Sequence, residues 1–288
     1  MPYRLSLALL VAALLSSSAS APFASGQVVR FDTSVGDFDM VLNPTNNPLL
    51  QGHVDNMLEY VETNRYRSSW INRAAENFVL QMGGFYSHTK RVPMSIVSTH
   101  AVGSFGNIAG EPAAENTPLS NTVGTVALAL PGNGAGGTNQ DGGSSSFFVN
   151  LTSNAFLDAD FTVFAAIPDM TTINKIMALM QTDLTAVPDF GAGDGNLGFS
   201  DVPLQDNGFQ VFIKRTFVIN DTLAVARARA GVESIMSASA AAAGAGGGST
   251  APSSASLSGA VVPEPTSGLL LIAGFLGGSL LAKRRRAR

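Results

Sequence analysis

The stretch WINRAAENFVLQMGGF, residues 70–85, sets a single arginine among apolar residues that resemble a buried strand. Arginine is rarely buried unless another group pairs with it, so Arg73 is either a satisfied structural charge or a charge aimed at a ligand. A guanidinium is always protonated and holds its N–H donors in a rigid fork. The chemistry open to Arg73 is therefore hydrogen-bond donation to an electron pair of a bound molecule.

The rest of the sequence removes most other kinds of catalysis. Cysteine is absent, which excludes disulfides, thiol nucleophiles and cysteine-ligated metals. The three histidines, His53, His88 and His100, show no metal-ligand spacing, and no Gly-x-Ser-x-Gly elbow of a serine hydrolase occurs. The glycine-rich residues 131–145 lack the Gly-Lys-Ser/Thr of a phosphate loop, and residues 189–201 lack the final Glu of an EF-hand. An enzyme built from this chain needs chemistry without a nucleophile, a metal or a cofactor.

The composition is that of a globular protein with extensions. With 45% hydrophobic and 13% charged residues, the chain of 288 residues is too apolar to be disordered. Its formal net charge of −4 disfavours a nucleic-acid partner, which would require a basic face. We expect one large domain over residues 27–222.

Hydrophobic periodicity predicts the elements of this domain. Alternation over residues 28–42, broken by Ser-Val-Gly-Asp, predicts a β-hairpin. Helical spacing predicts two amphipathic helices, one with Val54, Met57, Leu58 and Val61 and one with Ile173, Ile176, Met177 and Met180. Further β-like segments cover residues 76–84, 122–130, 145–151, 160–167 and 210–219. Many short strands with two isolated helices predict a mostly β fold, a closed antiparallel barrel with two capping helices.

The segment that contains Arg73 resembles the cyclophilin signature, Phe-His-Arg-Val-Ile-x-x-Phe-x-x-Gln-x-Gly-x-Phe. The residues in register with it are Arg73, Phe78, Gln81, Gly83 and Phe85. Residues 124–129, 145–149, 156–164 and 201–203 resemble later motifs of the family, in order. Cyclophilins are peptidyl-prolyl cis-trans isomerases, so the resemblance implies an eight-stranded barrel that rotates X-Pro bonds in proline-containing polypeptides and needs no cofactor.

The resemblance also implies a role for each matching residue. Arg73 and Gln81 are the expected catalytic residues, with Arg73 donating to the prolyl nitrogen of a twisted amide and Gln81 binding the substrate backbone and orienting Arg73. An apolar pocket for the proline ring is expected from Phe78, Val79, Ala129, Phe148, Phe156, Leu157 and Phe161.

Several positions depart from the family pattern. Asn72 replaces the usual His, Ser146 replaces a Gln, Ala74-Ala75 replace a larger apolar pair, and Phe156 stands where Trp is frequent. Because the arginine and the pocket residues are retained, we expect activity, slowed if the short side chain of Ser146 holds Arg73 less firmly. Two other functions stay open: a catalytically weak module that binds proline peptides, and a structural surface or matrix protein.

Residues 1–26 have the layout of a secretory signal peptide, with one basic residue, an apolar run over residues 5–15 and then small residues. The run is too short for a stable membrane span. We expect signal peptidase to cut after Ala21 or directly before Gln27. An N-terminal core helix is the alternative.

The C-terminal part differs in composition from the domain. Residues 223–261 are rich in Ala, Gly and Ser, which predicts a flexible linker. Residues 262–288 contain Pro263-Glu264-Pro265, an apolar run over residues 268–282 and a basic tail. This arrangement closely resembles the PEP-CTERM sorting signal of Gram-negative bacteria.

The sorting resemblance implies passage through the inner membrane, where residues 268–282 would reside transiently. An exosortase would cut near Pro263-Glu264-Pro265 and release the protein to the cell surface or the extracellular space. The alternative is a permanent anchor in the inner membrane that leaves the domain in the periplasm, because a basic tail after an apolar run stays cytoplasmic.

Overall fold

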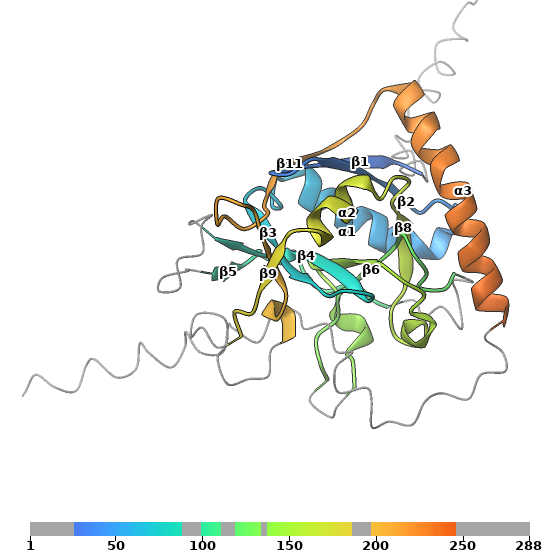
Figure 1. Cartoon of the computed structure of the whole chain (residues 1–288). Helices are drawn as coiled ribbons and strands as arrows, with labels where there is room; N and C mark the ends of the chain where they lie inside the picture. Colours follow the sequence, from blue (N-terminus) through green and yellow to red (C-terminus); the bar gives the residue numbers. More distant parts are fainter. Residues whose placement is uncertain (1–25, 88–98, 111–118, 134–136, 186–196, 246–288) are drawn as a thin grey trace, which may run out of the picture.

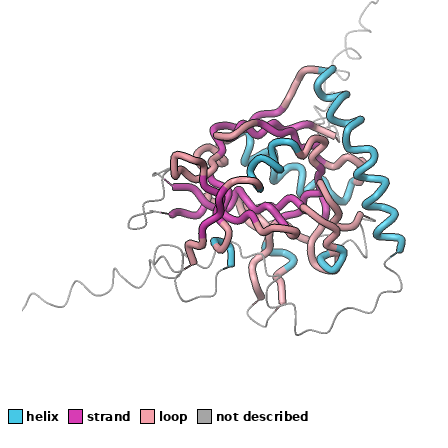
Figure 2. The backbone as a smooth tube through the Cα atoms, viewed as in Figure 1, coloured by secondary structure: helices cyan, strands magenta, loops and turns pink. Residues whose placement is uncertain are grey.

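The computed structural model describes residues 26–87, 99–110, 119–133, 137–185 and 197–245 (Figure 1). Its strands (magenta in Figure 2) form mainly one antiparallel sheet, in the order β11-β1-β2-β8-β6-β7-β4-β3. β5 pairs with β4 off this path, and β9 pairs with β10 separately. The strands span Val28–Thr33 (β1), Asp37–Leu42 (β2), Ser69–Ala74 (β3), Val79–Ser87 (β4), Thr99–Ala101 (β5), Thr125–Leu128 (β6), Phe147–Asn150 (β7), Val163–Ala166 (β8), Met180–Thr182 (β9), Val202–Leu204 (β10) and Ile213–Val218 (β11).

β1 and β2 form the hairpin that the alternation over residues 28–42 predicts. Phe31 lies opposite Phe38, and the two rings stack with their centroids 5.0 Å apart. The chain reverses after Thr33, whose amide donates to the carbonyl of Gly36 at 2.9 Å. Both phenylalanines belong to the core cluster that fills the barrel.

The two ends of the strand path, β3 and β11, meet and close the barrel almost completely. Trp70 pairs with Phe212 in an isolated antiparallel bridge. The amide of Ser68 donates to the carbonyl of Ile213 at 2.8 Å. The prediction of a mostly β, antiparallel barrel of eight strands is confirmed.

The two predicted helices are present as α1 (Gln51–Glu62) and α2 (Thr171–Met177). α1 buries the predicted stripe, which is Val54, Met57, Leu58 and Val61. α2 is shorter than the spacing of its apolar residues predicted, because it ends at Met177. Met180 lies in β9 instead and is 67% exposed. The prediction for Met180 is wrong because its backbone pairs with Leu204 on β10 instead of continuing the helix. Short 3-10 turns occur at Pro48–Leu50 (η1), Gln140–Gly142 (η2), Ala155–Leu157 (η3) and Leu197–Phe199 (η5).

A third helix, α3 (Thr222–Ala245), lies along one side of the barrel (Figure 1). A flexible linker was expected at residues 223–261, and the structure differs because residues 223–245 are helical. Alanine, which suggested a linker by composition, is also the strongest helix former. The carboxylate of Asp221 caps the helix by accepting from the amide of Leu223 at 2.8 Å.

The remaining predictions on the chain ends fall outside the described residues. These are residues 1–25 of the signal peptide, which was predicted over residues 1–26, and the sorting segment with Pro263-Glu264-Pro265. In the described ranges, no helix combines the length and the apolar character that a membrane span requires. The domain limits at residues 27 and 222 stay predictions.

The imidazole of His53 is buried, and burial alone accounts for its pKa shift. His53 on α1 is 3% exposed, and its ring centroid lies 5.6 Å from that of Phe164. Burial disfavours the charged imidazole and lowers the pKa of His53 from 6.5 to about 4. Because the unfolded chain takes up this proton at a higher pH than the folded chain, the stability is complete above pH 6.5 and is lost as the pH falls toward 4.

We expect the free energy of unfolding to fall more steeply between pH 7 and pH 4 in the parent than in His53→Leu. The difference should be about 3 kcal/mol, which is the pKa shift converted at about 1.36 kcal/mol per unit. Denaturant titrations at several pH values measure it. His100→Gln, which changes an exposed histidine on β5, should keep the parental pH dependence. Parallel curves for His53→Leu and the parent would refute a buried neutral imidazole.

Candidate active site

Arg73 stands on β3 and is turned out of the barrel core by a β-bulge. Ile71 and Ala74 both belong to the core cluster, although strand alternation puts residues three apart on opposite faces. Ile71 lies opposite Met82 on β4 whereas Arg73 lies opposite Gln81, so β3 contains one extra residue here. The bulge thereby places Arg73 on the outer face of the barrel.

The guanidinium of Arg73 is desolvated without full hydrogen bonding. Arg73 is 6% exposed, and no described residue accepts a hydrogen bond from its Nε or Nη1. Its Cζ lies 5.5 Å from the ring centre of Phe78, within the range of a cation–π contact. Burial lowers the pKa of Arg73, and the negative charge of Asp201 opposes that shift. Since the ordinary pKa of arginine lies far above neutrality, the group stays protonated and can donate to a ligand.

Gln81 and Phe148 lie in line with Arg73 on the outer face of the sheet. Gln81 on β4 pairs with Arg73 on one side and with Phe148 of β7 on the other. Phe148 pairs in turn with Ala127 of β6. Directly paired residues share a face of the sheet. The cation, the amide and the aromatic ring therefore form one row over β3, β4 and β7, and Ala127 extends this row to β6.

The apolar side chains beside this row form a cluster that is separate from the barrel core. Alternation along β4, β6 and β7 separates the two, because Val79, Ala127 and Phe148 point outward while their chain neighbours point inward. The cluster consists of Val79, Ala127, Ala129, Leu130, Phe148, Leu157 and Phe161, with Phe78 packed against it. All the predicted pocket residues except Phe156 therefore meet at one place, together with Ala127 and Leu130, which the motifs did not single out.

The aromatic residues divide into a floor and a rim. Phe148 and Phe161 are buried and meet edge to face, with centroids 5.5 Å apart and planes at 74°. Phe156 is 47% exposed, and its ring stacks on Phe78 at a centroid distance of 6.1 Å. Phe156 thus lies at the border of the cluster and offers one open face to solvent.

The loop of residues 154–161 brings three of the predicted pocket residues to the sheet, and buried asparagines hold it there. The Asn154 side-chain amide donates to Asn150 at 2.8 Å, and that of Asn150 donates to Asn121 at 3.0 Å. Asp158 Oδ1 accepts from the backbone amide and the side-chain amide of Asn121, at 2.8 and 2.9 Å. The motifs did not indicate these residues as a group, because Asn121 lies some thirty residues before its partners and only the fold brings them together.

Two of the departures from the family pattern have visible partners. Ser146 Oγ accepts from Gln81 Nε2 at 3.3 Å, so the short side chain at this position still contacts Gln81. Asn72 is fully buried and donates to the backbone carbonyl of Gly198 at 2.9 Å. Its amide therefore joins β3 to the η5 segment and is not directed at the apolar cluster.

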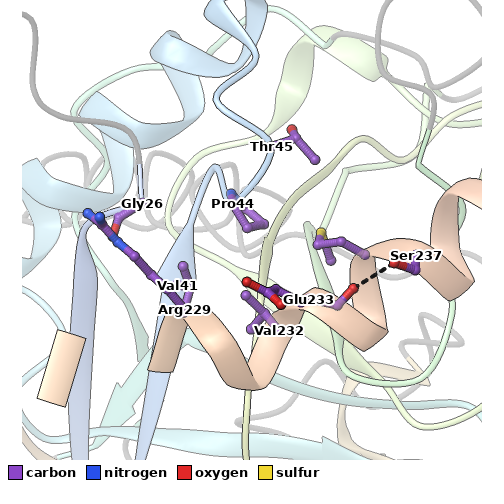
Figure 3. Close-up of a pocket in the computed structure, with 9 residues that line it drawn as sticks. Gly26, Val41, Pro44, Thr45, Arg229, Val232, Glu233 and Ser237 are labelled. Carbon is purple, nitrogen blue, oxygen red and sulfur yellow. Dashed lines mark hydrogen bonds between the residues drawn. The ribbon is translucent and has the colours of Figure 1, made fainter. Parts of the chain in front are cut away.

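A metal site and the cavity beside α3 are the alternatives to this site. Among the described residues, no three His, Asp or Glu side chains are grouped as metal ligands. A cavity of about 550 Å³ opens between α3 and the barrel, lined by residues that include Val41, Arg229 and Met236 (Figure 3). None of its lining residues belongs to the apolar cluster beside Arg73.

The fold and site together define a β-barrel protein with a desolvated cation beside an apolar patch. Residues 28–189, more than half of the chain, match the model of the family "Cyclophilin type peptidyl-prolyl cis-trans isomerase/CLD". The chain belongs to this family, and it is an enzyme of the cyclophilin-type peptidyl-prolyl cis-trans isomerase class.

Individual relatives are distant. The chain is 27% identical over 164 residues to a peptidyl-prolyl cis-trans isomerase of Acinetobacter baylyi, covering 54% of this chain and 75% of the relative. It is 28% identical over 133 residues to peptidyl-prolyl cis-trans isomerase A of Dickeya dadantii, covering 45% of this chain and 57% of the relative. A crystal structure of a Cryptosporidium parvum cyclophilin-type isomerase aligns over 68% of this chain and 98% of its own, with a TM-score of 0.44 and 15% identity.

Proposed function

We propose that Arg73 is the catalytic residue of this prolyl isomerase. Rotation about an X-Pro bond is opposed by amide resonance, with a barrier of roughly 20 kcal/mol. As the C–N bond twists, the prolyl nitrogen regains its lone pair, and a guanidinium beside it can donate a hydrogen bond to that pair. Since the bond forms mainly in the twisted state, it lowers the barrier and does not merely tighten binding.

The observation that carries this proposal is the pair of Arg73 nitrogens, Nε and Nη1, that are buried without a partner among the described residues. A buried donor left without an acceptor costs about 1–3 kcal/mol. A structural arginine would be expected to avoid this cost through a carboxylate. Binding of a substrate amide supplies the missing acceptor and makes the cost part of the mechanism.

The apolar cluster supplies the rest of the site. The proline ring has no polar group to be recognised by, so it requires an apolar surface next to the cation. Phe148, Phe161 and Leu157 form the floor that receives this ring, and the exposed face of Phe156 borders the path of the peptide. Gln81, between Arg73 and Phe148, hydrogen-bonds the substrate backbone and keeps it in register.

We predict that Arg73→Ala lowers kcat/KM for cis/trans exchange of a proline tetrapeptide by about 10²-fold or more, the usual effect of losing a charge-stabilising donor. Arg73→Lys should lose most of the rate as well, because an ammonium lacks the guanidinium fork. A protease-coupled or NMR exchange assay on the purified protein measures both.

The matched control is Arg67→Ala, which removes an exposed arginine shortly before β3 and should leave the rate unchanged. Equal rates for Arg73→Ala and the parent would remove Arg73 from the mechanism. Peptide binding without any rate acceleration in the parent would instead assign the site to recognition alone.

We also propose that the enzyme is exported and released. Support comes from the signal-like residues 1–26 and from the order of Pro-Glu-Pro, apolar run and basic tail in residues 262–288. Proline disfavours the interior of a helix, so a Pro-Glu-Pro motif suits a cleavage site better than part of a membrane span. Proline-containing polypeptides outside the inner membrane are then the substrates.

The mass of the mature protein from its native host tests this proposal. It should begin near Gln27 and lack residues 268–288, because signal peptidase and an exosortase-type protease remove the two ends. Replacement of Pro263-Glu264-Pro265 by alanines should leave the protein attached to the inner membrane. A mature species that still carries Arg288 would identify the tail as an ordinary anchor.

A further inference from the structure

Helix α3 lies beyond residues 28–189, the part that matches the family model, yet it is fastened to the barrel at both ends. Near its start, Ala228 is buried in an apolar cluster with Val28, Val41 and Ala166 of the barrel. Near its end, Ser239 Oγ donates to the carbonyl of Ser120 at 2.6 Å, and the Ser120 amide donates to the carbonyl of Ser239 at 3.3 Å. The cavity under the middle of the helix, seen in Figure 3, separates these two attachments.

The hydroxyl of Ser239 is used differently from that of a typical helix serine. A serine inside a helix commonly bonds the carbonyl four residues earlier. Ser237, two residues before Ser239, does so, since its hydroxyl donates to the carbonyl of Glu233 at 2.9 Å. Ser239 is fully buried and donates across the interface to Ser120 instead.

Ser120 connects this attachment to the wall of the active site. Its hydroxyl donates to Asp158 Oδ2 at 2.5 Å, while Asp158 Oδ1 accepts two hydrogen bonds from Asn121. Asn121 also accepts from the amide of Asn154 at 2.7 Å and donates to the carbonyl of Phe161 at 3.0 Å. These bonds hold both ends of the loop of residues 154–161.

That loop carries Leu157 and Phe161, two members of the apolar cluster, and it contains no strand. Its position on the sheet depends on side-chain hydrogen bonds and on packing, not on a backbone ladder. A shift of Asp158 would move Leu157, its chain neighbour, relative to Phe148. The stability of the pocket wall is therefore coupled to the polar network that Ser120 enters.

We infer that Ser239 is a positioning residue for the isomerase site, which it reaches through Ser120 and Asp158. Helix α3 is then a functional part of the catalytic unit, and not only a cover for the apolar side chains of β1, β2 and β8. The inference rests on the proposed proline site at Phe148, Leu157 and Phe161.

The test compares Ser239→Ala with Ser237→Ala in the full chain, at a temperature well below the melting point of either. Ser239→Ala should raise KM for a proline tetrapeptide by roughly three- to tenfold with kcat changed less than twofold, as expected for the loss of one buried hydrogen bond that places a binding wall. Ser237→Ala should match the parent in both constants. A lower melting temperature with KM unchanged would reduce Ser239 to a purely structural role.

A second variant keeps the test decisive if Ser239→Ala folds poorly. Ser120→Ala removes the bond to Asp158 and should raise KM in the same way. The double variant should be no worse than Ser120→Ala alone, because both changes break one connection. Additive effects on KM would mean that Ser239 and Ser120 act separately and would overturn the inference.

Amide hydrogen exchange without substrate separates this inference from the proposed function. In Ser239→Ala the amides of Leu157 and Phe161 should exchange roughly three- to tenfold faster than in Ser237→Ala, since their loop is less firmly held. Unchanged exchange would refute the connection even if Arg73 is catalytic. Faster exchange together with an active Arg73→Ala would uphold the connection and reject the proposed catalytic residue.

Discussion

The guanidinium of Arg73 is withdrawn from water while two of its nitrogens find no acceptor among the described residues, and the outer face of the barrel is arranged around this constraint. Without the bulge in β3, the parity of the strand would direct Arg73 into the apolar interior. With it, the cation lies in line with Gln81 and Phe148. A cation with two nitrogens that lack an acceptor among the described residues therefore lies beside an apolar surface, and the proposed binding of a prolyl amide and its ring rests on this arrangement.

The surface beside the cation is built from two kinds of structure with different rigidity. Val79, Ala127 and Phe148 belong to strands, and their positions follow from the hydrogen-bond ladder. Leu157 and Phe161 belong to a loop that depends on buried asparagines and on Asp158. Such networks are rigid when every member is bonded and weak when one member is lost. The attachment of α3 at Ser120 enters the network at this sensitive point.

The features that sequence could predict are those set by local periodicity or by a motif in fixed register. Alternation predicted the β1–β2 hairpin, and helical spacing predicted the buried stripe of α1. The signature indicated Arg73 and Gln81, the motif at residues 145–149 indicated Phe148, and the three lie on one face. The bulge at Asn72 and Arg73 was not predicted, because the pattern of side chains does not reveal one extra residue. Helix α3 was not predicted either, because its alanines favour a helix and a low-complexity linker equally by composition.

Long-range polar contacts are the second kind of feature that could not be predicted from the sequence. Asn121, Asn150 and Asp158 become partners only after β6 and β7 pair and the following loop folds back. The spacing of these residues matches no local rule, and each is unremarkable as a turn or strand residue on its own. The partial exposure of Phe156 also depends on this loop. The loop places the ring of Phe156 on that of Phe78, although the two residues are not partners on neighbouring strands.

The melting temperature of Arg73→Met, measured with its isomerase rate, tests most directly whether this arginine is held for a ligand. Methionine fills a similar volume without donors, so removing a desolvated and partly unsatisfied cation should leave the melting temperature equal to the parent or a few degrees higher while the rate is lost. A fall of the melting temperature by more than about 5 °C would instead mean that Arg73 is a structural charge balanced by Asp201, and would contradict the account.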